Sequence, residues 1–150
     1  MDCRGPLSVV LMLALTIMGL APAALALAAA PGTPGMARIW IYRDYQPYQT
    51  LARPYVRLNG AIAGISEPGG AFYRDVPPSV YHIEVESYCK DFNQSTNALL
   101  VAGEEAYVKI ESLHSWNVGL DWETDTFVVV VMEPDRGRSE IRSLAYESGD

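Results

Sequence analysis

Nucleophilic catalysis is the first chemistry to test, because the chain holds two histidines, His82 and His114, and a cysteine, Cys89, between them. A nucleophile needs a base within hydrogen-bond reach and a third group that orients the base. Cys89 follows His82 by seven positions, and an extended chain at about 3.3 Å per residue separates the two by roughly 20 Å or more. Cys89 meets His114 only if the intervening chain folds across. The sequence therefore predicts no catalytic residue, and we expect the protein not to be an enzyme.

A cation site is the second possibility, in the acidic segment GLDWETD. Asp121, Glu123 and Asp125 place oxygen ligands at alternate positions, as in part of a calcium-binding loop. The segment lacks the Gly at the sixth position and the Glu at the twelfth position that complete such a loop. A solvated acidic loop is the favoured interpretation, with a weak cation site as the alternative. We predict no metal and no other cofactor.

Aromatic side chains are the remaining chemical signal. Tyr45 and Tyr48 lie in a tyrosine-rich region, and Trp116 and Trp122 flank a segment expected to form an irregular loop. Exposed rings at such positions can stack on a sugar or on a partner protein. On sandwich strands, however, Tyr and Trp more often close the edges of the core. These four residues are the candidate binding residues.

Short strands separated by turn residues are the elements that must position these side chains. The segment 37–43 alternates between two faces, and Asn59-Gly60 predicts a type I′ hairpin within 53–65. Pro77-Pro78 ends one strand, after which alternation places Tyr81 toward the core and His82 toward solvent. Further strands are expected over 71–76, 97–102, 106–112 and 126–132, the last apolar enough to be buried on both faces.

The length of the chain, 150 residues, suits one hydrophobic core. Strands at this spacing predict an all-β fold, an antiparallel β-sandwich of about seven or eight strands. Residues 139–146 are expected to form either a short C-terminal helix or a last edge strand. The predicted organisation is a signal peptide over 1–28, a flexible spacer over 29–36, the sandwich over 37–146 and a tail over 147–150.

The first 28 residues have the layout of a secretory signal peptide. Arg4 precedes an apolar run from Leu7 to Leu20, and small residues with A-x-A spacing follow it. An uncleaved membrane anchor is the alternative, since the run approaches the length that spans a bilayer. We expect a periplasmic or secreted protein with no later membrane span. Cys89 is then the one remaining cysteine, either a free thiol or half of an intermolecular disulfide.

The charge of the chain excludes one class of partner. The net charge is −7 and the pI is about 4.7, whereas phosphate binding draws on clustered Lys and Arg. Nucleic acid is therefore not an expected partner, and anionic lipid is disfavoured.

Four motifs, taken in order, resemble a family of bacterial exported and lipoprotein domains of unknown function. They are ARIWIYR, VRLNGAIAGI, FYRDVPPSVYHIEVE and VAGEEAYVKIE, and the resemblance covers about residues 37–146. It implies a transthyretin-like or carboxypeptidase-regulatory-like sandwich. Ser79 stands where the family usually has Gly, so the turn must avoid positive φ there or carry strain. The family brings no catalytic residues.

Two functions from different classes follow. The first is a non-enzymatic domain that contacts another protein at the bacterial cell envelope. The second is a small-ligand or carbohydrate binder that uses Tyr45, Tyr48, Trp116 and Trp122. The expected partner is accordingly an envelope protein or a glycan. A hydrolase ranks third, because no spacing links the serines, histidines and acids.

Overall fold

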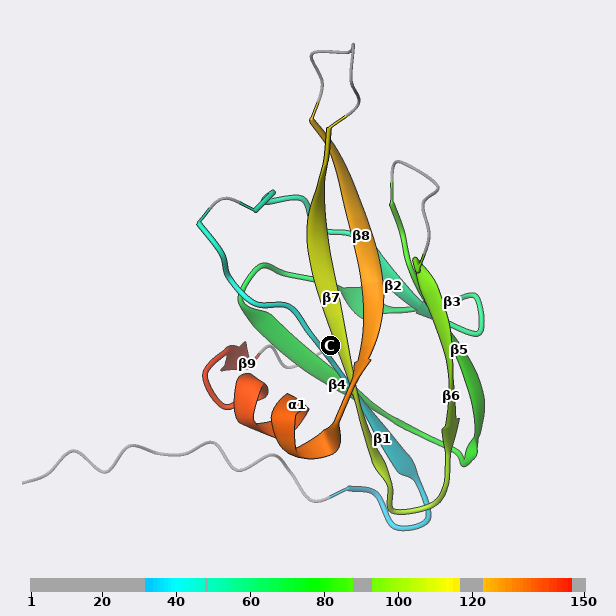
Figure 1. Ribbon diagram of the computed structural model, residues 1–150. Helices are drawn as coiled ribbons and strands as arrows, with labels where there is room; N and C mark the ends of the chain where they lie inside the picture. The colour runs from blue at the N-terminus through cyan, green and yellow to red at the C-terminus, as the bar shows by residue number, and fades with distance from the viewer. Residues whose placement is uncertain (1–31, 48, 88–92, 117–122, 147–150) are drawn as a thin grey trace, which may run out of the picture. The chain divides into compact units, whose positions relative to one another are not determined.

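Alternating apolar residues build two β-sheets that face each other in the computed structural model (Figure 1). The structure describes residues 32–47, 49–87, 93–116 and 123–146, which belong to one unit beginning at residue 31. The elements are β1 (Ala37–Tyr42), β2 (Tyr55–Leu58), β3 (Ala61–Ile65), β4 (Gly70–Val76), β5 (Ser79–Val85), β6 (Ser95–Leu100), β7 (Glu105–Trp116), β8 (Glu123–Met132), α1 (Pro134–Ile141) and β9 (Ala145–Tyr146).

The two sheets differ in their pairing. A five-stranded sheet has the order β8-β7-β1-β4-β9, and a four-stranded sheet has the order β3-β2-β5-β6. The predicted all-β sandwich is confirmed, and the four-stranded sheet is antiparallel throughout. The five-stranded sheet also contains two parallel pairs, β1 with β7 and β4 with β9. Neither pair is consecutive in the chain: strands of the other sheet lie between β1 and β7, and α1 precedes β9.

The main core lies between the two sheets. β1 is buried along its whole length, because it is the central strand of the five-stranded sheet and both of its faces are covered. One face enters the inter-sheet core, as the alternation of 37–43 predicts. The largest apolar side chains in that core include Ile39, Ile41, Val56, Phe72, Tyr81, Ile83, Val85, Val108, Ile110 and Phe127.

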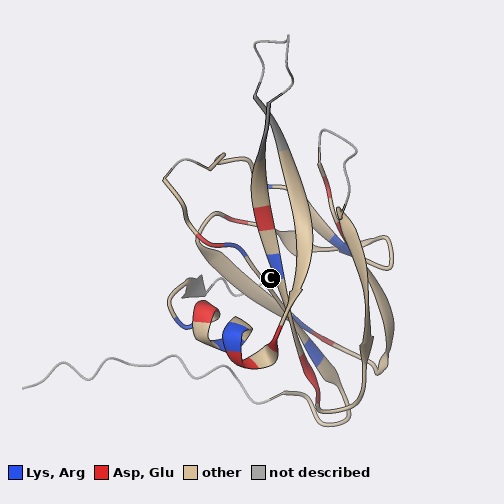
Figure 2. Ribbon diagram, in the orientation of Figure 1, with Lys and Arg blue, Asp and Glu red and all other residues tan. Residues whose placement is uncertain are grey.

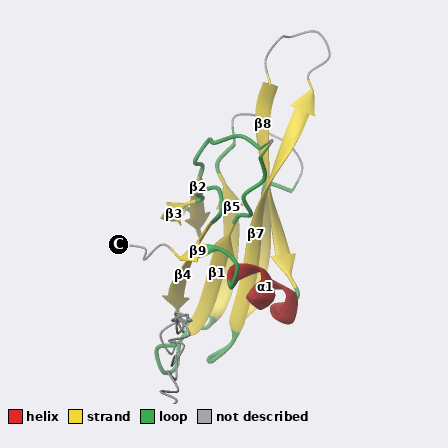
Figure 3. Ribbon diagram, turned by 90° about the vertical axis from the view of Figure 1, so that its left-hand side faces the viewer, coloured by secondary structure: helices red, strands yellow, loops and turns green. Residues whose placement is uncertain are grey.

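A second, smaller core lies on the outer face of the five-stranded sheet, where α1 packs against β7 (Figure 3). Gly137 of α1 permits this close approach, since a Cβ built there would lie 2.4 Å from the Cβ of Tyr107. The cluster consists of Trp40, Tyr42, Ala71 and Tyr107, with Tyr73, Met132, Ile141 and Leu144 packed against it. One sheet therefore has a covered outer face.

The turns follow the chemistry of their residues. Asn59 and Gly60 both have positive φ, 50° and 82°, which confirms the type I′ hairpin between β2 and β3. Ser79 is absent from the non-glycine residues with positive φ in the described part of the chain, so the turn carries no strain at that position. Because β4 and β5 belong to different sheets, Pro77-Pro78 marks a crossing between sheets.

The segment 114–125 differs from the predicted loop. β7 extends to Trp116 and β8 begins at Glu123, with these two residues opposite each other in register. Of the paired residues here only Trp116 and Thr124 are of types enriched in strands, but the backbone hydrogen bonds of an antiparallel ladder require neither a core nor particular side chains. Residues 117–122 lie outside the described residues.

The two C-terminal expectations also change. β8 is buried on both faces only over residues 126–129, and Val131 is 48% exposed, because β8 is an edge strand that pairs with β7 alone. After it, the helix begins earlier than predicted, at Pro134, where a Pro at the first helical position and Asp135 in the first turn favour initiation. The short β9 follows, so helix and strand occur in succession.

Candidate functional site

A cluster of charged residues joins α1 to the outer face of the five-stranded sheet. Lys109 extends from β7, and its Nζ lies 2.5 Å from Oδ2 of Asp44 and 2.8 Å from Oε2 of Glu140. The hydroxyl of Tyr42 donates to Glu140 Oε2 at 3.0 Å, and Arg136 Nε donates to Glu140 Oε1 at 2.8 Å. Figure 2 shows the charges of both signs on α1 and β7. The cluster thus ties three segments distant in sequence.

The interactions within this cluster shift the pKa values of Lys109 and Glu140 in the direction that favours their charged forms. Hydrogen bonds, first from Lys109 and then from Arg136 and Tyr42, lower the pKa of Glu140 to about 2 although burial opposes them. Burial would lower the pKa of Lys109, but its hydrogen bonds to Asp44 and Glu140 raise it. Burial and the bond to Glu140 raise the pKa of Tyr42. At neutral pH Lys109 and Glu140 are therefore charged, and Tyr42 is a neutral hydrogen-bond donor. These protonation states suit an ion-pair cluster that stabilises the structure rather than one that transfers protons.

A cavity of about 220 Å³ opens beside this cluster. One wall is the outer face of β7 above α1, and the other is the segment that follows β1. Strand alternation places Lys109, Glu111 and Leu113 on the same face of β7. The residues that line the cavity are Asp44, Gln46, Gln49, Lys109, Ile110, Glu111, Ser112 and Leu113.

Arg43 holds the segment that forms the second wall. Its side chain is 1% exposed and donates from Nη1 to the Ala52 carbonyl oxygen at 2.8 Å and from Nη2 to the Thr50 carbonyl oxygen at 2.6 Å. Its guanidinium carbon lies 4.9 Å from the centroid of the Phe127 ring. This buried arginine therefore connects β8, the end of β1 and the segment before β2.

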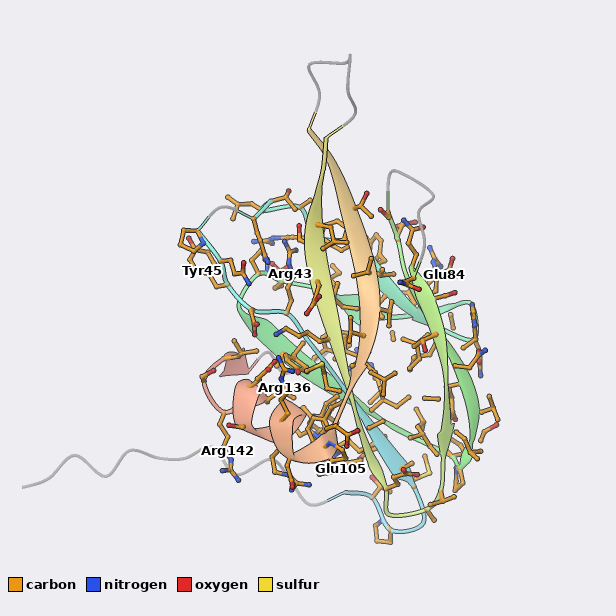
Figure 4. All side chains as sticks on the ribbon, in the orientation of Figure 1. Arg43, Tyr45, Glu84, Glu105, Arg136 and Arg142 are labelled. Carbon is orange, nitrogen blue, oxygen red and sulfur yellow. The ribbon has the colours of Figure 1, made fainter. Side chains whose placement is uncertain are left out.

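The opposite surface of the sandwich is different in character, because no described element covers the outer face of the four-stranded sheet. We call this surface the open face. Its exposed side chains are Tyr55, Ile62, Ile65, Val80, His82, Glu84, Asn97 and Leu99. Glu84 and Tyr45 lie on opposite sides of the molecule in Figure 4. The open face thus carries apolar side chains where the other sheet has its helix.

Four of the five apolar side chains of the open face occur in cross-strand pairs, and the fifth, Ile62, lies opposite Arg57. Val80 and Leu99, which are 56% and 70% exposed, are register partners on β5 and β6. Tyr55 and Ile65 are register partners on β2 and β3. A bulge in the β2–β3 ladder shifts the register after Ile62, so Ile62 and Ile65 are both exposed despite their odd spacing.

The middle of the open face is polar. Arg57 lies opposite Glu84 in register, and its Nη2 is 3.5 Å from Oε1 of Glu86. Nδ1 of His82 lies 3.0 Å from Oδ1 of Asn97. The predicted outward orientation of His82 is confirmed, and Asn97 is its hydrogen-bond partner.

Of the four predicted aromatic residues, the structure describes the side chain of Tyr45 alone, so their grouping stays a prediction. Tyr45 is 62% exposed on the segment after β1, and its Cβ packs against Gly69, whose φ is +75°. Trp116 ends β7, and its side chain lies outside the described residues, as do Tyr48 and Trp122 entirely. Cys89 and Asp121 also lie outside the described residues. Glu123 and Asp125 are placed in β8 by their backbone alone.

Sequence reasoning missed the charged cluster and the cavity. The alternation in 106–112 does place Lys109 and Glu111 opposite the apolar residues of β7, and this is the available signal. Nothing in the sequence fixes where α1 packs, so the partner Glu140 was not accessible to prediction.

The described residues contain neither a candidate membrane-spanning helix nor a cluster of metal ligands. Within residues 32–47, 49–87, 93–116 and 123–146, no helix has the length and apolar character of a membrane span. In the same ranges, no three His, Cys, Asp or Glu residues gather as metal ligands would. Comparison with family models, with curated proteins and with solved structures gave no match for this chain.

Proposed function

We propose that the protein is an exported, non-enzymatic domain of the bacterial cell envelope that contacts another protein through its open face. The leader-like residues 1–28 support the export step of this proposal, and the four motifs support the bacterial context. The observation that carries the contact is the pair of Val80 and Leu99, 56% and 70% exposed, on a sheet face that no described element covers.

The area and the composition of the open face both favour a protein contact. Fully burying a large aliphatic side chain contributes roughly 1.5–3 kcal/mol, and Val80 and Leu99, at 56% and 70% exposed, would contribute a corresponding part of this in a contact. Two cross-strand apolar pairs, with polar residues between them, resemble the mixture of apolar contacts and polar surroundings found at protein interfaces. On the outer face of the other sheet, Trp40, Tyr42 and Tyr107 are buried in the cluster beneath α1.

The test compares retention of envelope proteins by the purified full chain and by variants. Val80→Thr and Leu99→Gln make the open face polar, and Val131→Thr is the matched control, because Val131 is 48% exposed on β8 of the other sheet. We expect a defined protein to be retained by the wild type and by Val131→Thr, and to be lost by the other two variants. Circular dichroism verifies that each variant is folded.

Two outcomes would contradict the proposal. Retention of no protein by the folded wild type removes its support. Equal retention by all four chains places the contact elsewhere. Sedimentation of the purified chain separates a second copy of itself from a different partner, since a self-contact makes the sedimentation coefficient depend on concentration.

A further inference from the structure

We propose that the cavity beside Lys109 binds the ammonium or guanidinium end of a ligand whose charge is carried on an alkyl stem. The proposal concerns the five-stranded sheet and does not depend on the open face. It begins from a cavity of about 220 Å³ bounded by β7 and by Asp44, Gln46 and Gln49 of the segment after β1.

The charges around the cavity select a cation. The ammonium group of Lys109 forms ion pairs with two carboxylates, Asp44 at 2.5 Å and Glu140 at 2.8 Å. Its positive charge is therefore already compensated and does not attract an anion. Glu111 lines the cavity and is half-buried. With the residues that the structure describes, Glu111 makes no hydrogen bond or ion pair, and its interaction with Arg136 is a through-space attraction toward a guanidinium already bonded to Glu140.

An unpaired carboxylate in a recessed wall favours a charged donor over a neutral one. Hydrogen bonds between ionised groups are roughly twice as strong as those between neutral groups. Asp44 and Gln46 line the opposite wall, and carboxylate and amide oxygens are acceptors that suit the several donors of an ammonium or guanidinium group. The net charge of −7 favours the approach of such a ligand.

The apolar part of the cavity explains the alkyl stem. Leu113 lines the cavity on the same face of β7 as Glu111, two residues further along, and is 47% exposed. A methylene chain that lies against Leu113 while its charged end reaches Glu111 uses both residues. Basic side chains bury their stems in this way while their charged ends stay hydrated.

Two sources can supply this chemistry, a free amine and a basic side chain of a polypeptide, and nuclear magnetic resonance titration of the full chain distinguishes them. The probes are agmatine, the tripeptide acetyl-Gly-Arg-Gly-amide and, as the neutral control, glucose. We expect agmatine to shift the backbone amide resonances of Gln46, Gln49 and Glu111, with a dissociation constant on the order of 1 mM. The peptide shifts the same resonances if the cavity accepts a side chain, and not if it admits only a free amine.

Variants connect the shifts to the cavity. Glu111→Gln should weaken agmatine binding by about fivefold or more, the loss of one charge-assisted hydrogen bond. Glu84→Gln, on the open face, removes the same charge from an exposed carboxylate and should leave the affinity unchanged. Gln46→Ala lies in an exposed segment and gives a second weakening variant if Glu111→Gln fails to fold.

The overturning results are specific. If neither agmatine nor the peptide shifts these resonances at concentrations of tens of millimolar and at low salt, the proposal is refuted. Glucose that shifts the same resonances as strongly as agmatine refutes the selection of a cation. Equal weakening by Glu84→Gln and Glu111→Gln shows a nonspecific effect of net charge and also refutes the proposed site.

Discussion

Replacing Gly137 by Ala tests the packing of α1 most directly, because two physical effects oppose each other there. In an exposed helix interior, Ala is favoured over Gly by about 1 kcal/mol. In this structure Gly137 is buried, and a Cβ at this position would lie 2.4, 2.6 and 2.8 Å from the Cβ, Cγ and Cδ1 atoms of Tyr107. Propensity predicts a more stable protein, and packing predicts a less stable one.

The cost of overpacking at Gly137 exceeds the gain in helix propensity. An ordinary contact begins near 3.4 Å, so α1 must move by roughly 1 Å to accept the methyl group. Tyr107 cannot turn away easily, because it is 2% exposed and its hydroxyl donates to Glu105 Oε2 at 2.8 Å while accepting from Arg138 Nε at 3.2 Å. Overpacking costs about 1–3 kcal/mol. With the clash at the upper end of that range, the net loss is about 2 kcal/mol.

Urea unfolding followed by tryptophan fluorescence measures this difference, since Trp40 lies in the cluster under α1. At a denaturant dependence of about 2 kcal/mol per molar, the midpoint should fall by about 1 M. Ser139→Ala, at an exposed position of the same helix, is the control and should gain a few tenths of a kcal/mol. A midpoint for Gly137→Ala equal to or above that of the wild type would refute the reasoning that seats α1 on Tyr107.

Three further predictions concern the charged groups. Glu140→Gln should lower the free energy of unfolding, measured in urea, by about 1–3 kcal/mol. The reason is that Lys109, whose side chain is only 7% exposed, loses one of its two carboxylate partners. An unchanged midpoint would show that Asp44 alone satisfies Lys109. The protein should lose stability as the pH falls from about 4.5 toward 2. Arg38 lowers the pKa of Asp75 from 3.8 to about 2, and Lys109 lowers the pKa of Glu140 from 4.5 to about 2. Each carboxylate therefore stabilises the fold fully above its unfolded pKa and no longer does so below its folded pKa, and each contribution is roughly 1–2 kcal/mol after solvent screening. The unfolding midpoint measured across this pH range should fall less steeply in Asp75→Asn, and an identical slope would argue against the ion pair. Arg43→Met should speed hydrogen exchange of the amides in the segment 49–54 and destabilise the protein by about 2–4 kcal/mol, because the Thr50 and Ala52 carbonyl oxygens lose their donors. Unchanged exchange in this segment would show that its conformation does not depend on Arg43.

The fold was largely predictable because local chemistry decided its strands and turns. Asn59-Gly60 allows few backbone conformations other than a tight hairpin, and alternation in 80–85 needs only one buried face to be read correctly. The position of β8 at an edge was not predictable, because an apolar run describes what a strand can bury and not which strands lie beside it. The parallel pairing of β1 with β7 is equally a property of the whole chain path.

The candidate sites depended on such tertiary relations. Lys109 and Glu140 are 31 positions apart in the sequence, and only the packing of α1 on β7 brings them together. Gly137, which reads in isolation as a weak helix residue, makes this packing possible. Sequence reasoning instead favoured aromatic residues, whose grouping also depends on tertiary structure, and of these the structure describes the side chain of Tyr45 alone.

The different coverage of the two sheets has a consequence for how the two proposals can be tested. Val80 and Leu99 lie on the outer face of one sheet, whereas Glu111 and Lys109 lie on the outer face of the other, with the main core between them. Substitutions at sites this far apart, without shared partners, usually act additively. A chain that carries both Leu99→Gln and Glu111→Gln should therefore lose protein retention and cation binding to the same extents as the single variants. A greater loss in the double variant would mean that the two faces are coupled through the core, and each site would then have to be interpreted together with the other.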